Sequence, residues 1–396
     1  MSRHRDEIVV VRQGDVPLVN STLAALAADA FPDADIVDVD VLAEFRRNRR
    51  AWVTAAGPVA TGLARALARR RTFDVRATVK RAVLTSAAFS RFAQGAVTRV
   101  AAPGRTRFVL QSQSLFDASI PGVPLVVYTD HVHLANLGYP AFDRSRLQPA
   151  SSLAREAALY RRADLILVRS TNIADALRHG YGVDGDKVSV VGVGPNAPLP
   201  TALEPRWHGG RIVFVGYDWE RKGGPQLLAA FERVRDRHPD ARLDIVGVSD
   251  ISARPGVTLH GRLAGAEITL LLQRSDVFCL PTLAEPFGVA FIEAMHAGLP
   301  VVGTTIGAQP DFILPGRTGE LVTPDDVESL TDALERLVSD PERTMRLGAQ
   351  AAELARARYT WPQVTALMRR AIDERLAGSS GAGAGPSATR SRTRTS

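Results

Sequence analysis

Two glutamates at a fixed interval are the first candidates for chemistry in this chain. Glu285 and Glu293 lie in the segment CLPTLAEPFGVAFIEAMHAGLPVV, separated by seven residues. Pro286 and Gly288 interrupt the chain between an apolar run and a run of helix-forming residues, which predicts a strand, a loop and a helix that begins near Gly288. The first N–H groups of a helix lack intrahelical partners and carry the positive end of its dipole, so this loop offers a docking place for a diphosphate. Glu285 in the loop and Glu293 about 1.5 turns into the helix can address different parts of one ligand.

A histidine pair follows another expected strand. The apolar run Pro124 to Tyr128 leads directly into the sequence TDHVH. Open α/β sheets bind ligands at the carboxyl ends of their strands, so His131 and His133 stand where chemistry is expected. A lone histidine at such a place is more often a structural residue, so this signal depends on the other motifs.

A third candidate follows the expected strand RIVFV at 211–215. The chain continues there as GYDWERKGG, from Gly216 to Gly224. Glycine lets the backbone approach a diphosphate, and a neighbouring cation can neutralise the charge of that group. Lys222 is therefore a candidate phosphate ligand, and the alternative is an exposed lysine in a turn.

These motifs together resemble a known enzyme family. The order E-P-F-G-V-A-F-I-E-A-M, followed by G-L-P-V-V-G, is similar to the signature of retaining nucleotide-sugar glycosyltransferases of family 4. Two glutamates at this interval can also lie by chance on a surface helix, but the intervening P-F-G and the trailing A-M-x-A-G-x-P favour the family. The resemblance covers roughly Pro124 to Ala371. It implies transfer of a sugar from a nucleoside diphosphate to an acceptor hydroxyl, with retention of anomeric configuration.

The resemblance also implies roles for individual residues. Glu293 would hold the ribose hydroxyls of the nucleotide, and Glu285 would lie beside the donor sugar. His131, in preference to His133, would contact that sugar near the reaction centre, and Lys222 would bind donor phosphate. His131, Glu285 and Lys222 are thus the expected catalytic residues. The other expected donor-binding residues are Gly216, Arg221, Arg262, Leu263, Phe287, Gly288 and Val289. No metal and no further cofactor are expected.

The chain departs from the family at two places. An arginine commonly follows the glycine of the strand before Lys222, whereas Tyr217 stands here, so either Arg221 is the substitute or this charge is missing. Members of the family often carry a glycine pair after the first strand, whereas this chain has only Gly14. These departures keep two alternatives open: a nucleotide-sugar 2-epimerase of the same fold, and a sugar-nucleotide-binding protein without turnover. A dehydrogenase is disfavoured because no G-x-G-x-x-G follows a strand.

Composition places the chain among ordinary globular proteins. It has 396 residues, of which 45% are hydrophobic and 23% charged, enough for two domains. Its single cysteine, Cys279, excludes an intrachain disulfide and is expected to be a buried strand residue. No long apolar run and no signal peptide are recognised, which predicts a cytoplasmic protein.

The net charge of +7 is unevenly distributed. Three arginines lie in the Gly/Ser/Ala-rich tail after residue 376, which we expect to be disordered, and without them the charge is +4. Nucleic-acid binding is therefore not expected. The range from Arg46 to Arg81 is strongly basic, and apolar residues recur at helical intervals from Val83 to Phe92. This pattern suggests either a helix whose basic face is solvated and whose apolar face covers a core, or peripheral contact with the inner face of a membrane. In the second case the domain would face an acceptor that is lipid-linked, otherwise anionic, or a glycan.

A possible metal motif occurs near the N-terminus. Asp33 and Asp35, and again Asp38 and Asp40, form D-x-D triplets. We interpret them as alternation along a strand at 34–41, because nothing nearby supplies a nucleotide site.

Strand and helix alternate on both sides of a Pro/Gly-rich linker near residue 198. We therefore expect an α/β protein with two Rossmann-like, doubly wound domains that face a cleft, the GT-B type implied by the resemblance. The expected boundaries are residues 1–198 for an acceptor-side domain and 199–358 for a nucleotide-sugar domain. Residues 359–376 would form a helix that crosses back to the first domain, and 377–396 the tail.

Overall fold

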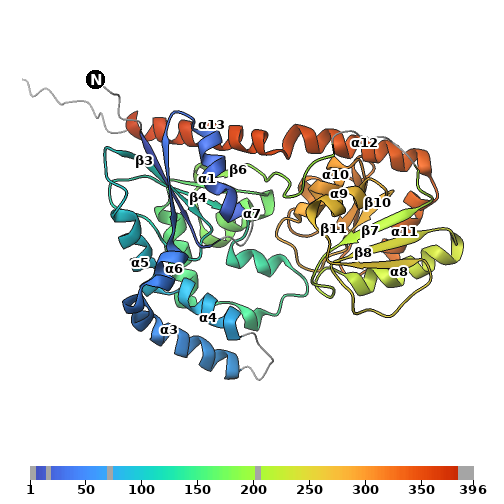
Figure 1. Ribbon diagram of the computed structural model, residues 1–396, viewed down its shortest axis with the longest axis horizontal. Coiled ribbons are helices and arrows are strands. Elements are labelled where there is room, and N and C mark those ends of the chain that lie inside the picture. The colour runs from blue at the N-terminus through green and yellow to red at the C-terminus, as the bar shows by residue number, and fades with distance from the viewer. Residues whose placement is uncertain (1–5, 15–18, 69–74, 201–206, 382–396) are drawn as a thin grey trace, which may run out of the picture.

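The chain forms two lobes, each built around a parallel β-sheet (Figure 1). The computed structural model describes residues 6–14, 19–68, 75–200 and 207–381. Each sheet has six strands with helices packed against it, which confirms the predicted fold class. Among the described residues, no helix has the length and apolar character needed to cross a membrane.

The first lobe has the strand order β2-β1-β3-β4-β5-β6. Its strands are β1 (Glu7–Arg12), β2 (Asp35–Asp40), β3 (Thr106–Ser112), β4 (Leu125–Thr129), β5 (Leu165–Val168) and β6 (Val188–Val190). Its helices are α1 (Val19–Ala30), α2 (Val41–Arg47), α3 (Arg49–Ala68), α4 (Val75–Leu84), α5 (Ala87–Thr98), α6 (Ala150–Arg162) and α7 (Thr171–Asp175), with 3₁₀ turns η1 (His133–Gly138) and η2 (Arg144–Arg146).

The second lobe has the order β12-β11-β10-β7-β8-β9. Its strands are β7 (Arg211–Val215), β8 (Arg242–Val246), β9 (Val257–Gly261), β10 (Val277–Cys279), β11 (Val301–Thr304) and β12 (Gly319–Val322). Its helices are α8 (Gly224–Arg237), α9 (Gly265–Leu272), α10 (Val289–His296), α11 (Val327–Val338) and α12 (Pro341–Arg358). β7 and β10 are the neighbours from which the chain proceeds in opposite directions, so their carboxyl ends form the switch point where such sheets bind ligands.

The last helix, α13 (Trp361–Gly381), runs back over the first lobe (Figure 1). Its Val364, Met368 and Ile372 are buried in one core with alternate residues of β1, such as Ile8 and Val10. The intervening residues of β1 face the opposite core, as the two-residue period of a strand requires. The predicted crossover is therefore present, and the helix continues five residues beyond its predicted end.

Two details of the first lobe refine the sequence interpretation. The apolar pattern from Val83 to Phe92 belongs to two helices, because Ser86 caps a new helix through a hydrogen bond from Phe89 N–H to its hydroxyl. Arg12 of β1 forms ion pairs with Asp38 and Asp40 of β2, at 3.0 and 3.1 Å. These carboxylates therefore stabilise the pairing of β1 with β2. In the second lobe, Cys279 of β10 is fully buried, as expected, and burial raises the pKa of its thiol.

Candidate functional site

Lys222 and Glu285 meet at the switch point of the second sheet. Lys222 follows β7 and Glu285 follows β10, and their side chains form an ion pair although they are 63 positions apart in the sequence. Gly223 makes this approach feasible: its φ is +73°, and a Cβ there would lie 1.9 Å from the carbonyl oxygen of Pro281. Only glycine lets these two loops come so close. The second lobe thus presents a paired cation and carboxylate where a ligand would bind.

The start of α10 lies beside this pair. Gly288 precedes the helix with a φ of +85°, and a Cβ there would lie 3.3 Å from Glu285 Cγ. Within the described part of the chain, the N–H groups of Val289 and Ala290 have no acceptor, which agrees with an anion-binding helix start. The ring of Phe287 is 2% exposed and packs against Phe312. Phe287 was predicted to bind the donor, and only its backbone can therefore face a bound molecule.

Glu293 lies on α10 and contacts the linker between the lobes. Its Oε1 accepts hydrogen bonds from the backbone N–H groups of Asn196 and Ala197, both at 2.9 Å. Burial raises the pKa of Glu293, while these two donors act against that rise. The carboxylate thus sits at the seam between lobes, and its Oε2 remains for another donor.

The first lobe contributes His131 from the loop after β4. Its Nε2 lies 3.1 Å from the side-chain nitrogen of Asn136, and its buried Nδ1 has no hydrogen-bond partner among the described residues. Burial lowers the pKa of His131 and outweighs the opposing charge of Asp130. His133 differs, because its Nε2 accepts the N–H of Gln148 at 2.8 Å and the residue is 7% exposed. His133 thus makes a hydrogen bond to the segment before α6, whereas the Nδ1 of His131 has no partner among the described residues.

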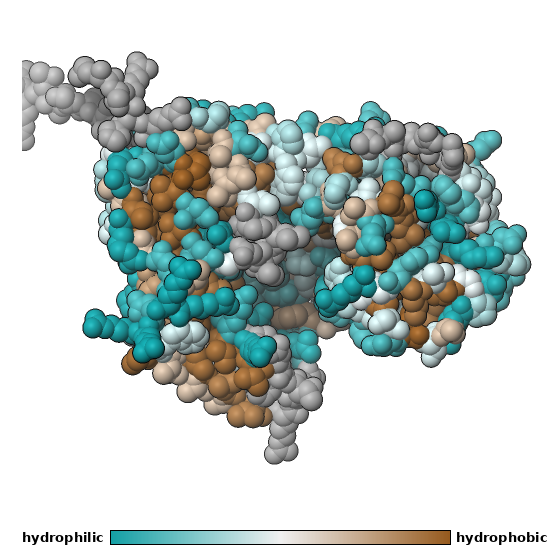
Figure 2. Space-filling model, in the orientation of Figure 1, coloured by the Kyte–Doolittle hydropathy of each residue, from teal (hydrophilic) through white to brown (hydrophobic). Residues whose placement is uncertain are grey.

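Residues of the two lobes interact across the space between them. The charge of Glu285 acts on Tyr139 of the first lobe: burial raises the pKa of this tyrosine, and Glu285 raises it further. Asp311 of the second lobe accepts hydrogen bonds from both the N–H and the hydroxyl of Thr171. Figure 2 shows the surface hollowed between the lobes. The carboxyl ends of both sheets therefore face one another.

The remaining predicted residues lie around the same strand ends. Arg221 donates to the carbonyl of Ala284 at 2.7 Å and lies 3.7 Å from Glu285. Arg262 lies over the ring of Tyr217, 5.4 Å from its centroid. Gly216 is next to Lys222, since a Cβ on it would lie 3.2 Å from Lys222 Cγ. Leu263, after β9, is half-buried.

Sequence reasoning missed three residues of the first lobe at this seam: Tyr139, Arg169 and Thr171. Arg169 is 5% exposed, pairs with Asp130 at 3.2 Å, and has two buried nitrogens without partners among the described residues. Arg169 directly follows the apolar run LILV, so its position at a strand end was a usable signal. Tyr139 and Thr171 carry no comparable local signal.

Comparison with known families decides the nature of the second lobe. Residues 209–340 match the family model described as glycosyl transferases group 1. The second lobe thus resembles a group 1 glycosyltransferase domain. The matched range contains Lys222, Glu285 and Glu293, so the resemblance recognised in the sequence is confirmed on the lobe that carries these residues.

Individual relatives agree with this assignment. The chain is 31% identical over 220 residues to the MMP alpha-(1->4)-mannosyltransferase of Mycolicibacterium hassiacum, covering 51% of this chain and 52% of the relative. It is 28% identical over 251 residues to the D-inositol 3-phosphate glycosyltransferase of Corynebacterium glutamicum, covering 56% and 60%. The matches thus span about half the length of these relatives.

The fold of both lobes also has solved counterparts. A sucrose-phosphate synthase from Thermosynechococcus elongatus superposes with a TM-score of 0.65 over 94% of this chain and 100% of that one, at 18% identity. At this identity the likeness concerns the fold, which is the two-Rossmann GT-B type.

Proposed function

We propose that this protein is a retaining glycosyltransferase that moves a sugar from a nucleoside diphosphate sugar to an acceptor hydroxyl without a metal. The observation that carries the proposal is the meeting of Lys222 and Glu285 beside the start of α10, near Tyr139 of the other lobe. This arrangement supports the proposal, because a cation and free helix amides can stabilise a leaving diphosphate and polar side chains can bind a sugar.

The leaving diphosphate gains negative charge as the bond to the sugar breaks. Lys222 and the N–H groups of Val289 and Ala290 would stabilise that charge in place. Lys222 pairs with Glu285 before donor arrives, so donor binding would move the lysine toward phosphate and leave Glu285 beside the sugar. Glu293 would hold the ribose through its remaining oxygen.

Retention needs the acceptor to attack on the face from which the diphosphate leaves. No separate nucleophile is assigned, so the departing phosphate would take the proton of the acceptor hydroxyl. His131 is neutral near pH 7, because burial lowers its pKa. A neutral imidazole would add no charge near the forming cation when it contacts the sugar.

A panel of UDP and GDP sugars tests the donor. A ligand that binds only the folded state raises its melting temperature Tm. We expect at least one sugar nucleotide to do so, and we expect Glu293→Ala to remove most of that shift. If no nucleotide sugar changes Tm, the donor site is wrongly assigned.

Product analysis separates the three alternatives. A transferase consumes donor and elongates an acceptor or slowly hydrolyses the donor. A 2-epimerase releases its product from donor alone, and a binding protein without turnover consumes none. The group 1 domain favours the transferase. The names of the two relatives specify different acceptors, so they leave the acceptor of this chain open.

We also propose peripheral contact with an anionic membrane through α3. Trp52 and Val53 are 41% and 77% exposed there, next to Arg49 and Arg50. Figure 2 shows apolar surface on this part of the first lobe. Exposed apolar and basic side chains together suit a membrane surface. In a flotation assay, the protein should rise together with anionic vesicles. Equal flotation with neutral vesicles would contradict this proposal.

A further inference from the structure

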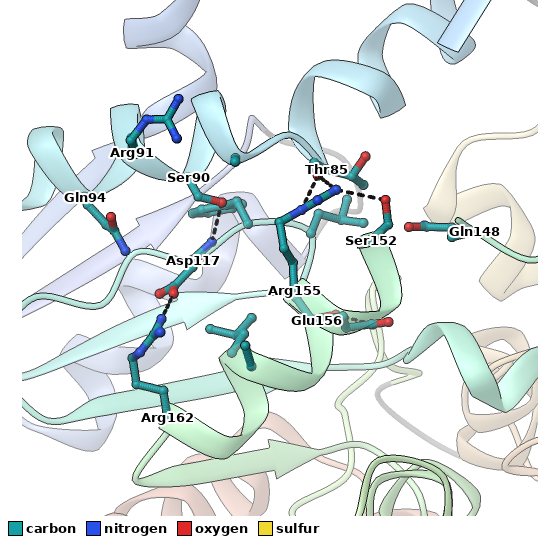
Figure 3. A pocket seen from close by; sticks show the side chains of 16 residues that line it. Thr85, Ser90, Arg91, Gln94, Asp117, Gln148, Ser152, Arg155, Glu156 and Arg162 are labelled. Carbon is teal, nitrogen blue, oxygen red and sulfur yellow. Dashed lines mark hydrogen bonds and ion pairs between the residues drawn. The ribbon is translucent and has the colours of Figure 1, made fainter. Parts of the chain in front are cut away.

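The first lobe contains a large cavity that the donor site does not use. It has a volume of about 890 Å³ and lies between α3, α4 and the segment 143–155. Cavities that hold small molecules usually measure about 300–1,000 Å³. A smaller cavity of about 270 Å³ adjoins it and shares Thr85, Gln148 and Arg155 with it (Figure 3).

The charge of the large cavity is positive. Arg81, Arg146 and Arg155 line it, against one carboxylate, that of Asp143. In the described part of the chain, Arg81 and Arg146 form no ion pair, and both are exposed. A cluster of unpaired guanidinium groups in a cavity favours an anionic ligand, because each offers several N–H donors to phosphate-like oxygens.

Arg155 is held in place from two sides. It donates to the carbonyl of Thr85 at 2.8 and 3.2 Å and to the hydroxyl of Ser152 at 2.9 Å, as the dashed lines in Figure 3 show. These bonds use Nε and Nη2, so Nη1 has no acceptor among the described residues. The guanidinium is therefore oriented before any ligand arrives.

The start of α6 adds further donors. Its N-cap residue, Pro149, makes no side-chain hydrogen bond to the first turn, and Pro149, Ser151 and Ser152 all line the cavity. The amides of an uncapped helix start attract an anion. Hydroxyl groups line the same space, among them Thr61 and Thr78. The cavity thus combines cations with groups that suit a polyhydroxy ligand.

One hydrogen bond connects the lining of the cavity to the loop that carries His131. Gln148 lines it and donates its N–H to His133, two residues from His131. Arg81 also acts electrostatically on both histidines: burial is the main cause of their lowered pKa values, and the charge of Arg81 acts in the same direction. A ligand in the cavity could therefore extend a hydroxyl toward His131.

We infer that this cavity is the acceptor site and that the acceptor is a polyhydroxy compound bearing a phosphate group, which Arg81, Arg146 and Arg155 bind. The inference rests on the proposed transferase function. A phosphate of this kind occurs as a monoester in soluble sugar phosphates and as a diester in lipid headgroups. Both present the same anionic oxygens to the arginines.

Binding of small phosphates tests the inference directly. Glycerol 3-phosphate represents the monoester, glycerophosphoglycerol the diester and glycerol the uncharged control. By titration calorimetry, we expect one of the two phosphates, but not glycerol, to bind the wild-type protein. The R81A/R146A double variant should bind it roughly tenfold or more weakly, since two charged hydrogen-bond donors are lost. The tighter of the two phosphates identifies the source of the acceptor.

Two control variants locate the site. Arg144→Ala removes an exposed arginine of the same 3₁₀ turn that does not line the cavity, and it should bind as the wild type does. Lys222→Ala should also keep phosphate binding, because Lys222 belongs to the donor site. Loss of binding in Lys222→Ala, equal binding by R81A/R146A and the wild type, or no binding of either phosphate would overturn the inference.

Failure of the transferase proposal would look different. In that case no nucleotide sugar would raise Tm of the wild type, regardless of whether glycerol 3-phosphate or glycerophosphoglycerol binds. If R81A/R146A retains the Tm shift given by the donor while losing phosphate binding, the acceptor site is separate from the donor site. Arg81 and Arg146 are exposed, so the double variant should keep the Tm of the ligand-free wild type.

Discussion

Lys222 and Glu285 form an ion pair at the point where the second sheet reverses its strand order. Glu285 is 8% exposed and also lies 3.7 Å from Arg221, so the carboxylate is held between two cations. A donor diphosphate would compete with Glu285 for Lys222. The pair therefore links the stability of the empty site to the binding of its substrate.

Removing the lysine should affect both rate and stability. We expect Lys222→Ala to lower kcat by about 100- to 1,000-fold, because a donor to the leaving group is lost. It should also lower the free energy of unfolding by on the order of 3 kcal/mol, since Glu285 then loses its closest partner. Arg237→Ala, which breaks an exposed ion pair of the same lobe, should cost about 1 kcal/mol or less and leave kcat unchanged. Unchanged transfer in Lys222→Ala would contradict the assigned role.

A glutamine at position 293 should separate stability from binding. Both backbone donors, Asn196 and Ala197, use Oε1 of Glu293, and a glutamine oxygen can accept both. Because burial raises the pKa of Glu293, its ionised form is disfavoured in the fold at neutral pH. Glu293→Gln should therefore raise Tm of the ligand-free protein by about 1–2 °C. It should weaken donor binding, because the second oxygen no longer accepts from ribose hydroxyls.

Calorimetric scans with and without donor check both effects. Tighter donor binding in Glu293→Gln than in the wild type would show that this carboxylate does not face the ribose.

The glycine before α10 should tolerate no side chain. Gly288 has a φ of +85°, and a Cβ on it would lie 2.7 Å from the ring of Phe291. Gly209 has a similar φ of +83° but open space around its Cβ position. Gly209→Ala should thus cost only backbone strain, about 1–2 kcal/mol, whereas Gly288→Ala adds a clash worth about 1–3 kcal/mol. Urea unfolding gives the difference, and equal losses would mean that Phe291 moves aside freely.

His133 should make the fold less stable in acid. Burial lowers its pKa from 6.5 to about 4. As the pH falls from 6.5 toward 4, His133 becomes protonated in the unfolded chain but stays neutral in the folded chain. The free energy of unfolding therefore decreases over this range. Glutamine can accept the same N–H of Gln148 without titrating, so His133→Gln should lose less stability over this range. Urea midpoints measured at about pH 7 and pH 4.5 test this, and parallel curves for both proteins would contradict it.

The sequence by itself determined the local elements and their order. The segment from Cys279 to Val302 predicts its own strand, loop and helix, because apolar periodicity and the Pro and Gly residues act over a few positions. Glu285, the histidine pair and Lys222 were visible as residue types after strands, and Glu293 as a residue of the helix that follows. The alternation of strands and helices also predicted two doubly wound lobes.

Only the tertiary structure decided which of these residues meet. Lys222 lies beside Glu285 because β7 and β10 are neighbours in the sheet. The periodicity of apolar residues within a segment does not predict the order of strands in a sheet. His131 is distinguished from His133 by hydrogen bonds to residues elsewhere in the chain, such as Gln148. The arginines at 81, 146 and 155 share one cavity because α4, η2 and α6 pack around it. Distances between strand ends and helix faces depend on the packing of the whole lobe, whereas patterns within a segment depend on that segment alone.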